Sequence, residues 1–377
     1  MRAYLNVVVF RVIMKYKIAV IPGDGTGPEV TREAMRVLDR VAKLHQLTIE
    51  TTAYNYGADH YFRTGELLTD ESIEALRQYD AIVLGAIGHP DAPPGLLERD
   101  ILLKLRFSLD QYINLRPVKL YPGVRSPLRD CEAMDYVVIR ENTGGLYTGV
   151  GRQIQAGTQQ EVAEQTMVYT YDQVERCLRY AFEYALRRHA TAPWSGLTQE
   201  QQAAGYRAKL TLCGKSNVLT YVFDLWDRVL SEMKRQYPHV IVDYVHVDAV
   251  CIYMVEDPAR FDVIVTTNMF GDIITDLAAT TQGGMGIAPG GNLNPEGVSM
   301  FEPIGGTAPL FTGKNEINPL AAIGAVGLML DHLGHSEAAI QVDQAIAKTT
   351  PQMLSMQAGK MGMSTVAVGD TVLKHLS

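Results

Sequence analysis

Hydrophobic and polar positions along the chain follow two alternating periods. Runs of the kind that form strands occur at residues 18–21, 48–54 and 81–85, and the first and the third of them are apolar. Between them, residues 28–44 and 70–78 repeat apolar side chains every three or four positions, as an amphipathic helix does. Strands that alternate with helices at this spacing are typical of α/β proteins. The pattern therefore predicts an α/β fold.

The middle of the chain continues the alternation. Residues 171–188 and 217–236 have helical periodicity, and residues 240–246 alternate as a strand does. Residues 191–205, between the two helices, are rich in Pro, Gly, Ser and Gln, which predicts an exposed insertion.

Two carboxylates four residues apart follow an apolar, strand-like run at residues 262–266. On a helix, Asp272 and Asp276 share one face, where their like charges repel unless a cation lies between them. Carboxylate oxygens suit Mg²⁺ or Mn²⁺. Asp248, at the end of a strand-like run, could supply a third carboxylate. The alternative is a solvated helix face, but the apolar flanking segments argue against it.

Three arginines lie near apolar segments, namely Arg106, Arg116 and Arg140. A guanidinium is costly to bury without an anionic partner, and its planar fork binds carboxylates through two hydrogen bonds. These residues are therefore candidates for binding an acidic substrate. Structural ion pairs with nearby acids are the alternative for each of them.

Tyr147 and Lys215 are candidate proton carriers. Tyr147 follows two glycines and offers a phenol that could pass a proton. Lys215 follows an apolar run, and burial of a lysine lowers its pKa toward the range that suits a general base. The alternative is a lysine at a strand end whose ammonium reaches water.

Composition narrows the class of protein. The 377 residues are 47% hydrophobic and 20% charged, enough for a large core and two domains. The net charge of −8 gives no electrostatic support for nucleic-acid binding. Four scattered cysteines without a CxxC pair indicate reduced thiols, so we expect a cytoplasmic protein. No apolar run reaches the length of a membrane span, and we expect translation to start functionally at Met14, after an extension of residues 1–13.

The chain resembles the metal-dependent β-decarboxylating dehydrogenases, the family of isocitrate and 3-isopropylmalate dehydrogenases. The resemblance runs from Ile18 to Leu373. Its most specific motif is Asn268-Met-Phe-Gly-Asp-Ile-Ile-Thr-Asp276, which is similar to the family's metal-ligand signature. Further motifs, in the family's order, are Arg140-Glu-Asn-Thr-Gly-Gly-Leu-Tyr147, Lys215-Ser-Asn217 and His246-Val-Asp248.

The resemblance implies an isocitrate/isopropylmalate dehydrogenase-like fold, with two α/β domains around a central cleft and no true Rossmann fold. Residues 1–111 and 283–377 would form a discontinuous cofactor-binding domain. Residues 112–282 would form the domain that binds substrate and metal and dimerises. The family uses homodimers with shared active sites, so Lys215 and Asp248 are expected to come from the partner subunit.

The resemblance also implies roles for the candidate residues. Arg106, Arg116 and Arg140 would hold substrate carboxylates, and Asp248, Asp272 and Asp276 would bind Mg²⁺ or Mn²⁺. Lys215, together with Asp248, would accept the hydroxyl proton, and Tyr147 would protonate the enol product.

Substrate choice in the family depends on the segment before the first substrate arginine. Isocitrate enzymes carry Ser and Asn there, whereas this chain has Leu102 and Leu103, which suit a branched alkyl group. The implied reaction is NAD-dependent oxidative decarboxylation of 3-isopropylmalate to 4-methyl-2-oxopentanoate and CO₂, a step of leucine biosynthesis. Two alternatives stay open, the same chemistry on another malate, such as D-malate, tartrate or a specialised-metabolism acid, and a non-catalytic regulatory subunit.

The cofactor would bind outside a dinucleotide fingerprint. The glycines of Pro22-Gly-Asp-Gly-Thr-Gly27 do not fit G-x-G-x-x-G, so we expect a tight turn there. By resemblance, the cofactor residues are Glu302, Gly305, Gly306, Thr307, Ala308, Pro309, Leu310 and Asn318. Gly305 replaces the family's usual histidine, and Leu310 occupies the position that selects between NAD and NADP. No cation is present at that position to favour the 2′-phosphate, so we expect NAD.

Overall fold

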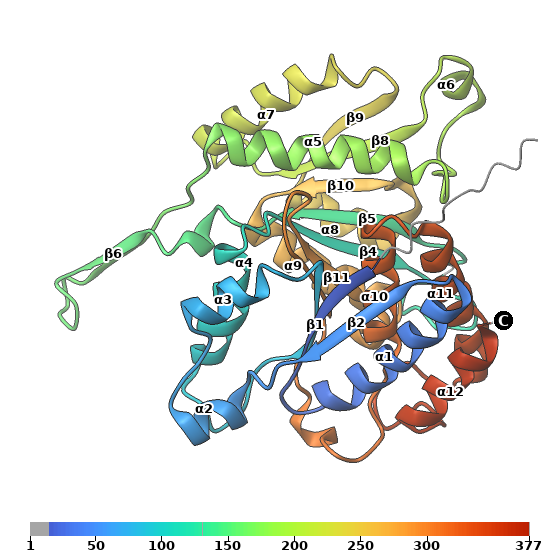
Figure 1. Ribbon diagram of the computed structural model, residues 1–377. Coiled ribbons are helices and arrows are strands. Elements are labelled where there is room, and N and C mark those ends of the chain that lie inside the picture. Colours follow the sequence, from blue (N-terminus) through green and yellow to red (C-terminus); the bar gives the residue numbers. More distant parts are fainter. Residues whose placement is uncertain (1–14, 130, 377) are drawn as a thin grey trace, which may run out of the picture.

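The computed structural model describes residues 15–129 and 131–376 (Figure 1), so the expectations for residues 1–14 lie outside it. Its largest element is a ten-stranded sheet in the order β2-β1-β3-β12-β11-β4-β5-β10-β8-β9. These strands are β1 (Lys15–Gly23), β2 (Thr48–Ala53), β3 (Ala81–Ala86), β4 (Ile113–Lys119), β5 (Asp135–Glu141), β8 (Ala208–Gly214), β9 (Val240–His246), β10 (Val263–Thr266), β11 (Pro289–Leu293) and β12 (Ser299–Pro303).

The strand order divides the sheet into two halves. Strands from residues 15–86 and 289–303 form one half, and strands from residues 113–266 form the other. Pairing is parallel toward both ends, whereas β11 and β4 pair antiparallel with each other and with their outer neighbours, β12 and β5. The antiparallel centre is therefore the place where the two halves join.

Helices cover both faces of the sheet, which confirms the predicted α/β class (Figure 1). They are α1 (Gly27–Leu44), α2 (Ala58–Thr64), α3 (Asp70–Leu76), α4 (Lys104–Ser108), α5 (Tyr171–Arg188), α6 (Gln199–Ala203), α7 (Thr220–Lys234), α8 (Val247–Glu256), α9 (Asn268–Thr281), α10 (Leu320–His332), α11 (Ser336–Thr349) and α12 (Thr365–His375). None of the helices in the described ranges is long and apolar enough to cross a membrane.

The two faces of the sheet are packed differently. One face carries a continuous hydrophobic core, which joins strand residues of both halves to α1, α5, α7, α10, α11 and α12. The opposite face carries two separate cores, one packed under α3 and α4 and the other under α8 and α9. Polar side chains of the central strands occupy the interval between these two cores. This interval is where the candidate site lies.

The periodicity located most elements well. The helix predicted at 171–188 and the strand predicted at 240–246 coincide with α5 and β9, whereas the helix predicted at 217–236 is shorter, as α7. Asp248 was placed at a strand end, but β9 ends at His246 and Asp248 lies in the first turn of α8.

The insertion at residues 191–205 is largely exposed, as predicted, but it is anchored to the domain. Its Leu197 is buried, and the Trp194 indole donates a hydrogen bond to the Ala259 carbonyl at 2.9 Å. It also contains the short helix α6, whose N-terminus is capped by Thr198 and Gln201. The capping pattern was present in the sequence but was not used in the prediction.

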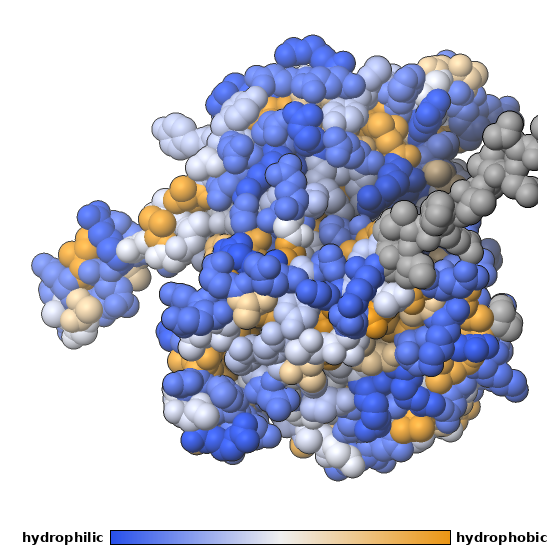
Figure 2. All heavy atoms as spheres, viewed as in Figure 1, coloured by the Kyte–Doolittle hydropathy of each residue, from blue (hydrophilic) through white to orange (hydrophobic). Residues whose placement is uncertain are grey.

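A two-stranded arm, β6 (Gly151–Ile154) paired with β7 (Val162–Gln165), projects from the body of the molecule (Figure 1). Its side chains Val150, Ile154 and Val162 are exposed, and hydrophobic residues are visible on the arm in Figure 2. An isolated two-stranded ribbon is marginally stable in water by itself. A surface that packs against the arm would therefore stabilise it.

Candidate active site

Arg140 is the centre of the candidate site. It lies on β5, and its side chain is only 1% exposed. Its Nε donates to the Asn268 carbonyl at 2.8 Å, and its Nη2 donates to Asn268 Oδ1 at 2.7 Å. Its Nη1 donates to Asp272 Oδ1 at 2.6 Å, so the start of α9 is bound to the end of β5. Burial lowers the pKa of Arg140, and the charge of Asp272 opposes that effect.

Gly271 explains why α9 can approach Arg140 so closely. A Cβ atom at position 271 would lie 2.4 Å from Cγ of Arg140, so a larger residue would push the helix away. The glycine of the Asn268–Asp276 motif thus permits the contact between Arg140 and Asp272. The sequence motif contained this signal, although its packing role is apparent only in the structure.

Asp272 and Asp276 lie four residues apart on α9, as the spacing predicted, and in the single chain both are exposed, which the sequence analysis did not expect. Tyr147 donates its hydroxyl hydrogen to Asp272 Oδ2 at 2.9 Å, and the Arg140 guanidinium lies 5.2 Å from the centre of the Tyr147 ring. Burial raises the pKa of Asp276, and the neighbouring charge of Asp272 raises it further. A bound cation would oppose both effects, so this carboxylate pair fits a hard divalent ion.

The turn that precedes Tyr147 is held by a buried acid to which the sequence analysis gave no role. Glu141 accepts hydrogen bonds from the backbone N–H groups of Thr143 (2.9 Å) and Gly144 (2.8 Å). These bonds fix the turn that leads into the short 3₁₀ helix at Leu146–Thr148. The glutamate follows Arg140 directly within the Arg140–Tyr147 motif, but the motif by itself did not indicate this bonding role.

Lys215 and Asp248 form a second polar group. Lys215 lies one residue beyond β8, and its Nζ is 2.9 Å from Asp248 Oδ2. The hydrogen bond from Lys215 lowers the pKa of Asp248. The two residues are partners, as expected, and both side chains are accessible to solvent in the single chain.

The three predicted metal ligands do not form one site within the single chain. Among the described residues, no group of three or more His, Cys, Asp or Glu side chains is placed to hold a metal ion. Asp272 and Asp276 stand together on α9, whereas Asp248 is bound to Lys215. Asp248 of the same chain therefore does not complete the carboxylate pair.

Arg106 and Arg116 lie beside Arg140 on the polar interval of the sheet. Arg106, on α4, donates from Nη2 to Glu302 Oε1 at 3.3 Å. Arg116, on β4, is buried, and burial lowers its pKa to about 10 despite the opposing charge of Glu302. Two buried guanidinium groups with one nearby carboxylate leave positive charge available for an acidic ligand.

The leucines predicted to select the substrate lie in an unusual helix. Residues Glu98–Leu103 form a π-helix that continues into α4, a geometry that is rare and often found at functional sites. Leu102 packs against the core under α3 and α4, whereas Leu103 is not part of any of the three cores. Both are partly exposed, so Leu103 is the better placed to meet a ligand.

A cavity of about 380 Å³ brings together half of the predicted cofactor residues. Gly305, Gly306, Ala308 and Asn318 line it, and the residues of its lining carry no charged side chain. Of the other four, Thr307 accepts hydrogen bonds from Thr26 through its carbonyl, and Glu302 is buried beside Arg106. Pro309 and Leu310 lie in a short 3₁₀ helix next to the cavity, and Leu310 is 79% exposed.

The turn between β1 and α1 forms part of the same region. Gly23 and Gly25 have φ values of 71° and 57°, and a Cβ at Gly25 would lie 2.4 Å from the Thr307 carbonyl oxygen. The predicted tight turn is therefore confirmed. The sequence analysis missed Met285, Phe311, Ile317 and Met356, which supply apolar lining from three distant segments.

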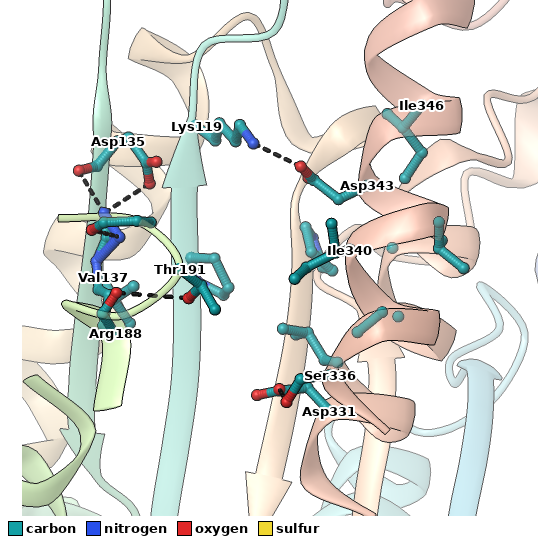
Figure 3. Close-up of a pocket in the computed structure, with 18 of the residues that line it drawn as sticks. Lys119, Asp135, Val137, Arg188, Thr191, Asp331, Ser336, Ile340, Asp343 and Ile346 are labelled. Carbon is teal, nitrogen blue, oxygen red and sulfur yellow. Dashed lines mark hydrogen bonds and ion pairs between the residues drawn. The ribbon is translucent and has the colours of Figure 1, made fainter. Parts of the chain in front are cut away.

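A second cavity, of about 390 Å³, lies on the face with the continuous core, between β4 and β5 on one side and α10 and α11 on the other (Figure 3). It contains none of the predicted site residues. Lys119 and Asp343 join its two walls through an ion pair of 2.6 Å (Figure 3).

Comparison with known proteins gives a consistent result. The model of a family described as isocitrate/isopropylmalate dehydrogenase matches residues 17–372. The chain is 48% identical to a 3-isopropylmalate dehydrogenase of Thermobifida fusca over 366 residues, 96% of this chain and 98% of that protein. It is 46% identical to one of Streptomyces coelicolor over 362 residues, covering 96% and 98%.

Solved structures agree. An isocitrate dehydrogenase from Methylococcus capsulatus matches with a TM-score of 0.82 at 30% identity, covering 96% of this chain and 99% of the other. The TT0538 protein from Thermus thermophilus matches with a TM-score of 0.80 at 29% identity, covering 96% and 68%.

Proposed function

The chain belongs to the isocitrate/isopropylmalate dehydrogenase family, and we propose that it oxidatively decarboxylates 3-isopropylmalate to 4-methyl-2-oxopentanoate and CO₂, with NAD as oxidant. The observation that carries the proposal is the 48% identity, over 96% of the chain, to a 3-isopropylmalate dehydrogenase. The product would serve leucine biosynthesis. The association of Arg140, Tyr147 and Asp272 supports this chemistry in the fold.

The substrate carries two carboxylates and an isopropyl group. Arg106, Arg116 and Arg140 supply the buried positive charge for the carboxylates. Leu103, at the end of the π-helix and three residues before Arg106, suits the isopropyl group, whose burial contributes roughly 1.5–3 kcal/mol. A third carboxylate, as in isocitrate, would be placed against the same leucine at a comparable cost.

The chain's own residues account for the proton transfers. Lys215, hydrogen-bonded to Asp248, accepts the proton of the 2-hydroxyl group, and Tyr147, bound to Asp272, returns a proton to the enol. Asp272 and Asp276, with Asp248 of a second subunit, would hold Mg²⁺ or Mn²⁺. A metal held there would supply Lewis-acid stabilisation of negative charge on the substrate oxygens, and NAD would supply the hydride acceptor.

The choice of NAD is supported by the uncharged cavity. The residues that line it include no lysine or arginine that could pair with a 2′-phosphate. Leu310, at the selecting position, is exposed and apolar and offers no such charge either. We therefore include in the proposal a preference for NAD over NADP.

The test of the proposed reaction is a substrate panel with purified protein, Mn²⁺ and NAD. NADH formation is measured with 3-isopropylmalate, isocitrate, D-malate and tartrate, and is repeated with NADP. We expect kcat/KM for 3-isopropylmalate to exceed that for isocitrate by about 10²-fold or more, since the alkyl and carboxylate effects add. A higher value for any of the other acids would reject 3-isopropylmalate as the substrate.

The proposal includes a homodimer with shared active sites. The helices that carry the candidate metal ligands also expose large apolar side chains, Ile252 and Val255 on α8 and Ile273 on α9, each about half exposed in the single chain. Neighbouring apolar side chains on two packed helices favour burial against another surface. Docking of two chains by this face would bring Asp248 and Lys215 of one chain toward Asp272 of the other.

A mixed dimer tests this arrangement. One subunit carries Lys215→Ala, the other carries Asp272→Asn, and two affinity tags isolate the heterodimer. If both subunits contribute to each active site, one of the two sites in the heterodimer has native residues at both positions. We therefore expect about half of the native activity. If each site is built within one chain, both sites are damaged, and the heterodimer will be as inactive as the parent homodimers.

The proposal keeps the predicted division into a cofactor domain of residues 1–111 and 283–377 and a substrate domain of residues 112–282. It also keeps the cytoplasm as the location. The join between β11 and β4 is compatible with such a division, because both chain crossings fall beside it.

A further inference from the structure

Two buried amide side chains connect Arg116 to Glu302, which lies on β12. Arg116 Nε donates to Asn114 Oδ1 at 2.7 Å, and Asn114 Nδ2 donates to Asn292 Oδ1 at 2.8 Å. Asn292 Nδ2 then donates to Glu302 Oε1 at 2.7 Å. The same glutamate oxygen accepts from Arg106 at 3.3 Å. The bonds form one continuous path between the two arginines.

The register of the sheet produces this path. Asn292 on β11 is directly opposite Asn114 on β4, which in turn is opposite Arg140 on β5. Side chains at paired positions point to the same face, here the face between the two separate cores. Both asparagines are fully buried, so their amides have no access to water. Their side-chain hydrogen bonds are made within this path, apart from one that Asn292 Oδ1 accepts from Asn142 Nδ2 at 3.1 Å.

The direction of the bonds has a consequence for the charges. Each amide accepts through oxygen on the Arg116 side and donates through nitrogen on the Glu302 side. A cation at one end and a carboxylate at the other polarise both amides in the same sense, and this strengthens every bond between them. An aliphatic side chain at either position would interrupt the path and leave a buried charge with one partner fewer.

Arg116 is held by this path while its terminal N–H groups stay available to a ligand. Asn114 binds Arg116 through Nε. The two terminal nitrogens of Arg116 donate no hydrogen bond to any residue that the structure describes. That edge of the guanidinium therefore stays free for a ligand carboxylate. Had a carboxylate stood at position 114, it would have competed with the substrate for the same charge.

We propose that Asn114 and Asn292 are positioning residues that fix Arg116 and Arg106 at the separation the substrate requires and tie both to Glu302. This inference rests on the proposed function. In this role the asparagines of β4 and β11 fix the positions of the two arginines relative to Glu302 on β12.

The test compares Asn114→Ala and Asn292→Ala with Asn294→Ala. Asn294 directly follows β11 and lies outside the path. Its alanine variant also loses hydrogen bonds, one from Nδ2 to the Leu109 carbonyl at 3.0 Å and one from the Glu296 N–H to Oδ1 at 3.0 Å. The affinity for D-malate is measured by calorimetry, together with kcat, KM and Tm. We expect the Kd for D-malate and the substrate KM to rise about tenfold in both path variants and to stay near native in the control.

A double variant sharpens the test. Because both asparagines act in one path, Asn114→Ala/Asn292→Ala should bind D-malate no more weakly than the weaker single variant, whereas independent sites would add. The inference would be overturned if both single variants kept Kd and KM within about twofold of native while their Tm fell as in the control. Failure of the proposed function would appear separately, as a native enzyme that does not turn over 3-isopropylmalate.

Discussion

Replacement of Lys215 by alanine is expected to lower kcat by about 10³-fold or more while binding of NAD stays near native. The residue is the proposed acceptor of the hydroxyl proton, and positioned general bases contribute roughly 10²–10⁴-fold to rate. Its Nζ lies 2.9 Å from Asp248, so the variant also leaves that carboxylate without its partner. Single-turnover kinetics with saturating substrate and NAD measure the effect on the chemical step.

The chain contains a matched control for this variant. Lys209 lies on β8, the strand that ends just before Lys215, and its Nζ is also 2.9 Å from an aspartate, Asp243 on β9. Lys209→Ala therefore removes a similar Lys–Asp pair without touching the candidate site. Comparable kcat values in the two variants would mean that the loss at position 215 is structural, and Lys215 would lose its role as the base.

The second large effect is expected for Asp272→Asn. This change removes a proposed metal ligand and the charge that pairs with Arg140, so activation by Mn²⁺ should shift to much higher concentrations and kcat should fall by about 10²-fold or more. The measurement is a Mn²⁺ titration of the initial rate at saturating substrate and NAD. An asparagine keeps the shape of the side chain, so a loss of activity reflects charge and ligation.

An acid outside the proposed site provides the comparison. Asp370 on α12 is also exposed and pairs with an arginine, Arg36, at 2.6 Å. Helix α12 packs against α1 and α11, whereas α9 packs against β5 and α8. Asp370→Asn should leave the Mn²⁺ dependence native. If Asp272→Asn has the same Mn²⁺ dependence as Asp370→Asn, the ion binds elsewhere and the carboxylate pair on α9 has another purpose.

The sequence predicted the fold and the residue types of the site for identifiable reasons. Periodicity located α5 and β9 because both have uniform patterns and clear ends. The prediction that Asp272 and Asp276 lie on one face of a helix was correct, because helical geometry fixes the relation between positions four residues apart. Local rules of this kind need no knowledge of the rest of the chain.

What the sequence did not provide depends on contacts between distant segments. Asn114 and Asn292 read as ordinary strand polar residues until the register places them opposite each other. The π-helix at Glu98–Leu103 has no periodic signature that separates it from an α-helix. The apolar lining of the cavity that contains Gly305 and Asn318 comes from residues as far apart as Met285 and Met356, which periodicity cannot bring together.

The position of β12 and β11 in the sheet also constrains how the molecule can be made. These two strands fill the space between β3 and β4, although they are synthesised long after both. Until residue 303 has left the ribosome, β3 and β4 each present an open edge with unpaired backbone groups. The two halves of the sheet therefore cannot join until β11 and β12 have been synthesised. Until then, the nascent chain has two unpaired strand edges that could pair wrongly.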